Sequence, residues 1–94
     1  MTKAKDLHRK WMKQPAYRAE YDALEREFQI ARTLIKARQR AGLTQTDVAR
    51  RMRTSQSYVA RIESGKVTPS TAALQRFARA TGSRLKIVFE PFRA

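Results

Sequence analysis

The sequence predicts an all-α domain of about five helices, with one C-terminal β-strand that pairs between chains. Its 94 residues are enough for a single modest core. Apolar residues recur at the spacing of three and four that is typical of helices from residue 17 to residue 41, and again in shorter segments up to residue 78. Only residues 85–90 alternate apolar and other side chains with a period of two, which indicates a strand.

The first helical segment is long. Pro15 is acceptable in the first turn of a helix, and no Gly or Pro follows until Gly42. One long helix and two helices meeting near residues 25–29 both fit this pattern, and residues 1–14 fit a short helix or a disordered arm. One apolar stripe runs along the segment and consists of Tyr17, Tyr21, Leu24, Phe28, Ala31 and Ile35.

Two short helices with a tight connection follow. Gly42 is suited to the left-handed conformation that ends the preceding helix, and Thr44 is suited to cap the next one. Thr54 or Ser55 is expected to cap the second short helix, and Gly65 to end it. The expected buried seam consists of Val48, Ala49, Met52, Val59 and Ile62, which leaves Gln56, Ser57 and Arg61 on the outer face.

The chain ends with one more helix and the strand. Residues 66–71 form a turn with hydroxyl groups that are suited to capping, and residues 72–81 carry apolar groups on one face until Gly82 ends the helix. Leu85, Ile87 and Phe89 then lie on one side of the expected strand, which Pro91 stops. The sequence contains no second strand, so this segment is expected to pair with its own copy or with a different protein.

The charge of the chain implies a polyanionic partner. Lys and Arg number 21 against 8 Asp and Glu, which gives a formal net charge of +13. From residue 32 to residue 66 there are nine basic residues and two acidic ones, whereas residues 1–31 hold five of the eight acids. The excess positive charge therefore belongs to the pair of short helices and the residues that follow it.

Several classes of function find no support. His8 has no second His and no Cys nearby in the sequence, so a metal site is not expected, and no Gly-rich phosphate loop or catalytic arrangement is evident. We expect no enzymatic activity, no cofactor and no small-molecule substrate. The absence of Cys fits a reducing compartment, and neither a membrane-spanning run nor a secretory signal is evident, so a cytoplasmic protein without a membrane partner is expected.

Residues 38–77 resemble the helix-turn-helix of phage-repressor and Cro-like proteins, the XRE family. The resemblance is carried by Arg-Gln-Arg-Ala-Gly-Leu-Thr-Gln at 38–45, Val-Ala at 48–49, Ser-Gln-Ser-Tyr-Val at 55–59 and Arg-Ile-Glu-Ser-Gly-Lys at 61–66. It implies sequence-specific binding to double-stranded operator DNA, with Gln45 on a phosphate and Gln56 reading a base. It also implies a structural ion pair between Arg38 and Glu63. The full set of expected DNA-binding residues is Thr44, Gln45, Arg53, Ser55, Gln56, Ser57, Tyr58, Arg61 and Lys66.

Some of these assignments leave alternatives open. Arg61 fits a contact with a guanine or with a phosphate only. Arg53 fits a backbone contact or simple solvation, since clustered Arg usually supplies attraction that is independent of sequence. Tyr58 fits stacking on DNA or packing beside the buried seam. Adenine is a natural partner for Gln56, because a carboxamide pairs with its N6 and N7 atoms.

The layout of residues 15–91 is similar to the HigA-type antitoxins of toxin–antitoxin operons. That resemblance implies a repressor of its own operon that neutralises a RelE/HigB-like ribonuclease toxin. Trp11, Tyr17, Tyr21 and Leu24 are the candidate contacts with this toxin. Packing of the helical stripe on the domain or on a dimer mate is the simpler explanation of Tyr17, Tyr21 and Leu24, and Trp11 also fits a residue that covers the end of the first helix. The alternatives are a stand-alone repressor and an interaction protein that has lost DNA binding.

Three regions are expected: an N-terminal arm and helical extension at 1–30, the DNA-binding domain at 31–82, and a dimerisation strand and tail at 83–94. A homodimer is expected because one helix-turn-helix reads too few base pairs for tight specificity and because the strand needs a partner. Leu85, Ile87 and Phe89 are the candidate dimer contacts. Antiparallel pairing across a two-fold axis would place two recognition helices about 34 Å apart on a palindromic operator.

Overall fold

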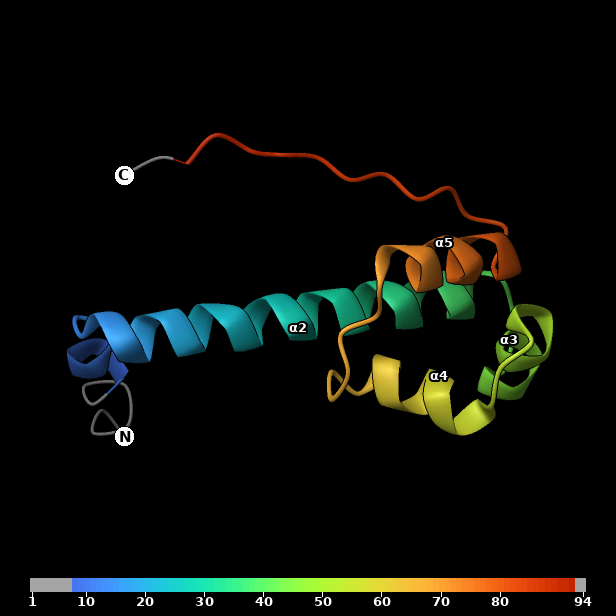
Figure 1. Ribbon diagram of the computed structural model, residues 1–94, viewed down its shortest axis with the longest axis horizontal. Helices are drawn as coiled ribbons and strands as arrows, with labels where there is room; N and C mark the ends of the chain where they lie inside the picture. Colours follow the sequence, from blue (N-terminus) through green and yellow to red (C-terminus); the bar gives the residue numbers. More distant parts are fainter. Residues whose placement is uncertain (1–7, 93–94) are drawn as a thin grey trace.

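The computed structural model describes residues 8–92 and confirms the all-α prediction. Residues 8–11 are helical and are followed by α2 (Pro15–Arg40), α3 (Gln45–Met52), α4 (Gln56–Glu63) and α5 (Thr71–Ala80). Helices α3, α4 and α5 gather around the C-terminal half of α2, whose N-terminal half extends away from them (Figure 1). The expected N-terminal arm lies partly outside the described residues.

Helix α2 is a single helix of 26 residues, which decides between the two arrangements that the sequence allows. It ends where predicted, because Gly42 adopts a φ of 71° and its N–H donates to the carbonyl of Gln39 at 3.0 Å. The side chain of Arg38 donates to the carbonyl of Leu43 at 3.0 Å and closes the same turn. The chain therefore turns sharply into α3.

Hydroxyl side chains start the three shorter helices. Thr44 and Asp47 form a reciprocal capping box at α3, in which the side chain of each residue bonds the backbone N–H of the other. Ser55, rather than Thr54, caps α4 by accepting a bond from the N–H of Tyr58 at 3.1 Å. Ser70 caps α5 in the same way.

One core joins the four helices, and the predicted seam lies at its centre. Phe77, Ile62, Val48 and Val59 are the largest fully buried side chains. The core is completed by Leu34, Ala49, Met52 and Ala80, with Ile30, Ala37, Leu43, Tyr58, Val67 and Leu74 partly buried around it. Burying a side chain of this size stabilises the fold by about 1.5–3 kcal/mol.

Of the two kinds of packing expected for the apolar stripe of α2, packing on its own domain is seen only in the C-terminal half of the helix, and packing on a dimer mate stays a prediction. Tyr21, Leu24 and Phe28 are 38%, 54% and 48% exposed, whereas Ala31 and Leu34 are buried. The physical reason is the reach of the smaller helices, which cover only the C-terminal half of α2 (Figure 1). Within residues 8–92, an apolar face of α2 is therefore left without a cover.

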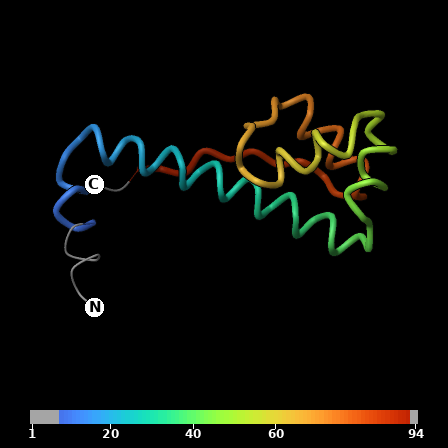
Figure 2. The backbone as a smooth tube through the Cα atoms, turned by 90° about the horizontal axis from the view of Figure 1, so that it is seen from below, coloured from blue at the N-terminus to red at the C-terminus, as the bar shows by residue number. Residues whose placement is uncertain are grey.

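Residues 83–92 leave α5 and run back toward the N-terminal end of α2, opposite in direction to that helix (Figures 1 and 2). They are extended, and within residues 8–92 they have no partner strand. Ile87 is 62% exposed and Phe89 is fully exposed, while Leu85 is partly buried. The predicted pairing with another chain stays a prediction. Within the described part, no helix is both long enough and apolar enough to span a bilayer.

Candidate nucleic-acid interface

The start of α4 carries an exposed set of polar side chains. Ser55, Gln56 and Ser57 are exposed at its first turn, and Arg61 is exposed one turn later. The opposite face of α4 is fixed in the core by Val59 and Ile62. Because the buried face sets the rotation of the helix, the predicted reading side chains are all left facing outward.

A chain of hydrogen bonds links this surface to the interior. Gln56 Nε2 donates to Gln45 Oε1 at 2.7 Å, and Gln45 Nε2 donates to Glu63 Oε1 at 3.0 Å. Glu63 is also held by Arg38, whose Nε and Nη2 atoms donate to the two carboxylate oxygens at 2.8 and 3.0 Å. The ion pair expected between Arg38 and Glu63 is therefore present, with side chains only 16% and 3% exposed.

This network determines which hydrogen-bonding groups of Gln56 are available to a ligand. One of its two amide hydrogens is used by Gln45, so its Oε1 acceptor and the second hydrogen are left for an outside partner. Gln45 is oriented in turn by a buried carboxylate that cannot donate. The network therefore holds the Gln56 carboxamide in one orientation before any ligand binds.

The surface around the short helices presents almost no free negative charge. Between residues 32 and 89 the only acids are Asp47 and Glu63, and both are bound to groups of the same chain. Hydrogen bonds from the backbone and side chain of Thr44 lower the pKa of Asp47 below its ordinary value of 3.8. The Arg and Lys side chains here therefore meet little competition from carboxylates of their own domain.

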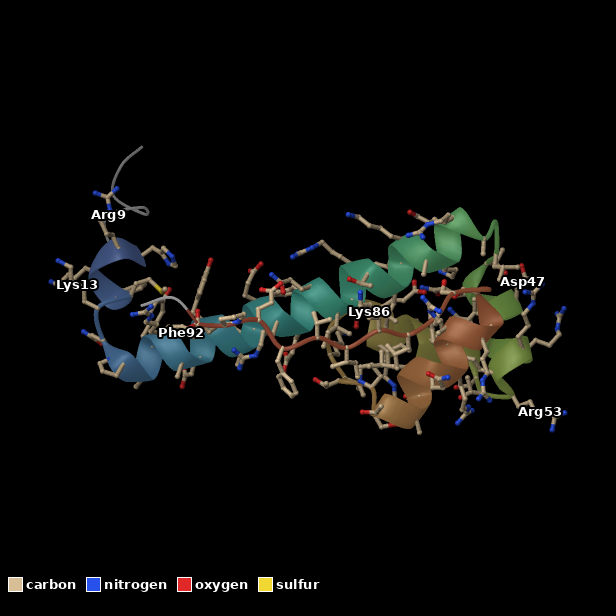
Figure 3. The ribbon with its side chains drawn as sticks, turned by 90° about the horizontal axis from the view of Figure 1, so that it is seen from above. Arg9, Lys13, Asp47, Arg53, Lys86 and Phe92 are labelled. Atoms are coloured by element: carbon tan, nitrogen blue, oxygen red, sulfur yellow. The ribbon has the colours of Figure 1, made fainter. Side chains whose placement is uncertain are left out.

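The remaining predicted contacts divide into two groups. Lys66 and Arg53 are exposed, and Arg53 extends from the end of the molecule opposite Arg9 and Lys13 (Figure 3). Thr44 is exposed as well but has its hydroxyl oxygen engaged by the backbone of Asp47. Tyr58 packs against the core, so of its two expected roles the structure supports packing.

The predicted partner-binding residues lie at the far end of α2. Residues 8–11 fold back on the start of this helix, where the His8 Nδ1 and Tyr17 Oη atoms are 3.1 Å apart. The ring centroids of Trp11 and Tyr17 are 5.5 Å apart, and those of Tyr17 and Tyr21 are 6.3 Å apart. Trp11 therefore covers the start of α2, and Leu24 lies outside this aromatic cluster on the exposed stripe.

Sequence reasoning missed two arginine contacts between α3 and α5. Arg51 Nη1 donates to the carbonyl of Ala80 at 2.9 Å, and Arg76 Nη2 donates to the carbonyl of Met52 at 2.6 Å. These pairs are 29 and 24 residues apart, so no local spacing signals them. Within residues 8–92 no group of acidic, His or Cys side chains is arranged to hold a metal ion.

Residues 29–84 match the protein family described as a helix-turn-helix domain. The chain is also similar to the protein named Antitoxin HigA1 from two strains of Mycobacterium tuberculosis, CDC 1551 / Oshkosh and ATCC 25618 / H37Rv. Each relative is 33% identical over 76 residues, which is 81% of this chain and 51% of the relative. The chain thus spans about half the length of these curated relatives. No solved structure matches it significantly.

Proposed function

Since the chain belongs to the helix-turn-helix family, we propose that it is the antitoxin of a toxin–antitoxin pair and represses its own operon by binding operator DNA. The family match and the similarity to HigA1 directly support a DNA-binding regulator that is not an enzyme. The operator, the toxin and the dimer are the proposed parts.

The observation that carries DNA reading is the network from Arg38 to Gln56. A fixed carboxamide at the start of an exposed helix suits bidentate bonding to adenine, with Oε1 accepting from N6 and the free amide hydrogen donating to N7. Arg61, one turn later on the same face, suits a guanine or a phosphate.

Base reading is tested by operator selection followed by binding of Gln56→Ala and Arg61→Ala variants. Each substitution is expected to cost about 1–3 kcal/mol at the base pair it reads and to relax the preference there. Arg26→Gln is a matched control, because Arg26 is an exposed residue of the protruding half of α2. An unchanged operator preference in the Gln56→Ala, Arg61→Ala double variant would contradict the assignment.

A basic, RNA-binding toxin suits the N-terminal half of α2. This half carries the uncovered apolar residues Tyr21 and Leu24, and the acids Glu20, Asp22, Glu25 and Glu27 lie along the same segment. Charge complementarity of this kind guides association and suppresses wrong partners. The similarity to proteins named antitoxins supports the same assignment.

Co-expression with the small open reading frame beside the gene tests the toxin. We expect a stable complex on pull-down and growth arrest when the neighbour is expressed alone. The double substitution Tyr21→Ala, Leu24→Ala should weaken the complex, whereas Gln56→Ala should leave it intact. If no complex and no toxicity are found, the protein is a stand-alone repressor, and operator selection remains the test of its function.

A further inference from the structure

A hollow between α3 and α5 is lined mainly by arginine. Its walls are Arg51, Met52, Arg53, Arg76, Arg79 and Ala80, and its volume is about 330 Å³. No acidic side chain lines it. Four arginines and no carboxylate line the hollow, so an anion that enters it would be attracted by the positive charge around it.

Helix capping explains two of the four arginines. Arg51 and Arg76 donate to the carbonyls of Ala80 and Met52, the last residues of α5 and α3, where the helix dipole favours a positive charge. Each guanidinium carries five N–H donors, so most of them are still available after these bonds. The same bonds hold the two side chains in place.

Capping does not explain Arg53 and Arg79, whose side chains make no hydrogen bond within the described residues. Arg53 has a φ of 58° and is the only residue other than Gly with positive φ in residues 8–92. Arg53 is the C-cap of α3, a place where a left-handed residue is common but is usually Gly, because a Cβ atom makes this conformation unfavourable. An arginine is thus kept at a position that glycine would occupy with less strain.

We propose that this hollow binds a phosphate of the DNA backbone beside the groove that α4 enters. Arg53 lies on the turn between α3 and α4, three residues before Gln56, so one wall of the hollow is next in the chain to the surface proposed to read bases. Arginine forks match phosphate oxygens in pairs. The inference rests on the proposed DNA binding and extends the contact from α4 to α5.

The test is the salt dependence of binding between the full chain and its selected operator duplex. Each phosphate contact contributes about 0.9 to the slope of log K against log salt. Arg79→Gln is expected to lower the slope by about one for each protomer bound and to weaken binding roughly five- to tenfold for each near 0.1 M salt. The base preference should not change, and Arg76→Gln should act in the same direction.

Arg26→Gln is the control, since it removes the same charge from an exposed position on α2 that does not line the hollow. Equal slopes for Arg79→Gln and Arg26→Gln would overturn the proposal. Wild-type protein that binds no operator at all would instead refute the proposed function. Titration with inorganic pyrophosphate, monitored by NMR of the arginine Nε–H groups, tests whether the hollow binds a free phosphate compound instead of the DNA backbone. Shifts at Arg53 and Arg79 with pyrophosphate, combined with an unchanged DNA slope in Arg79→Gln, would also overturn the assignment to DNA.

Discussion

Replacing Glu63 by Gln tests whether the buried ion pair holds both the fold and the reading surface. The Glu63 carboxylate accepts three hydrogen bonds, two from Arg38 and one from Gln45. A Gln side chain keeps the size of Glu but is neutral, and one of its two terminal atoms donates instead of accepting. The substitution therefore leaves the largely buried Arg38 guanidinium without its counter-charge.

The expected loss of stability is large for a domain of this size. Breaking a buried ion pair by changing one partner costs about 3–5 kcal/mol, and Gln falls near the lower end because one of its atoms still accepts. A loss of about 3 kcal/mol is a substantial part of a typical total of 5–15 kcal/mol. It corresponds to a fall in Tm of roughly 12–24 °C, at about 4–8 °C for each kcal/mol.

Urea denaturation followed by circular dichroism measures this loss, and Glu25→Gln is the matched control. Glu25 pairs with Arg32 at 3.3 Å, but the two side chains are 47% and 56% exposed. An exposed pair of this kind contributes less than about 1 kcal/mol. Equal destabilisation by Glu63→Gln and Glu25→Gln would refute the reasoning. Operator binding by Glu63→Gln should also weaken while the protein is still folded, because Gln45 and Gln56 lose their anchor.

Three further predictions follow from single features of the structure. Arg53→Gly should stabilise the fold by about 0.5–1 kcal/mol, since relief of the left-handed conformation exceeds the entropy cost of Gly. Arg50→Gly, within α3, should destabilise the fold by about 1 kcal/mol, and thermal unfolding of both variants checks the opposite signs. The lowered pKa of Asp47 means that its carboxylate stabilises the fold above pH 3.8 and that this contribution is lost as the pH falls through and below that value; Asp47→Asn should therefore flatten the acid side of the stability curve, and an unchanged curve would point to another titrating group. Deletion of residues 85–94 should make the protein monomeric in analytical sedimentation and weaken operator binding while its helix content stays close to that of α2–α5; a truncated protein that is still dimeric would show that the tail is not the dimer contact.

The sequence was most informative where one hydrogen bond joins close neighbours along the chain. Thr44 caps α3 through Asp47, three residues away, and Ser55 caps α4 through Tyr58 at the same distance. Gly42 ends α2 through its own φ angle. The resemblance to a known family added the pairing of Arg38 with Glu63, which lies 25 residues away and which spacing alone does not predict.

The sequence by itself therefore determined the helices, their caps, the buried seam and the positive charge, because each of these depends on local bonding or on the period of the side chains. Only the tertiary structure decided that α2 is one helix whose stripe is exposed at Tyr21, Leu24 and Phe28, since this depends on how far the three shorter helices reach along it. It also decided that Gln45 links Gln56 to Glu63 and that arginines of α3 and α5 surround one hollow. These contacts join residues far apart in the chain, and the angles at which the helices pack set their distances.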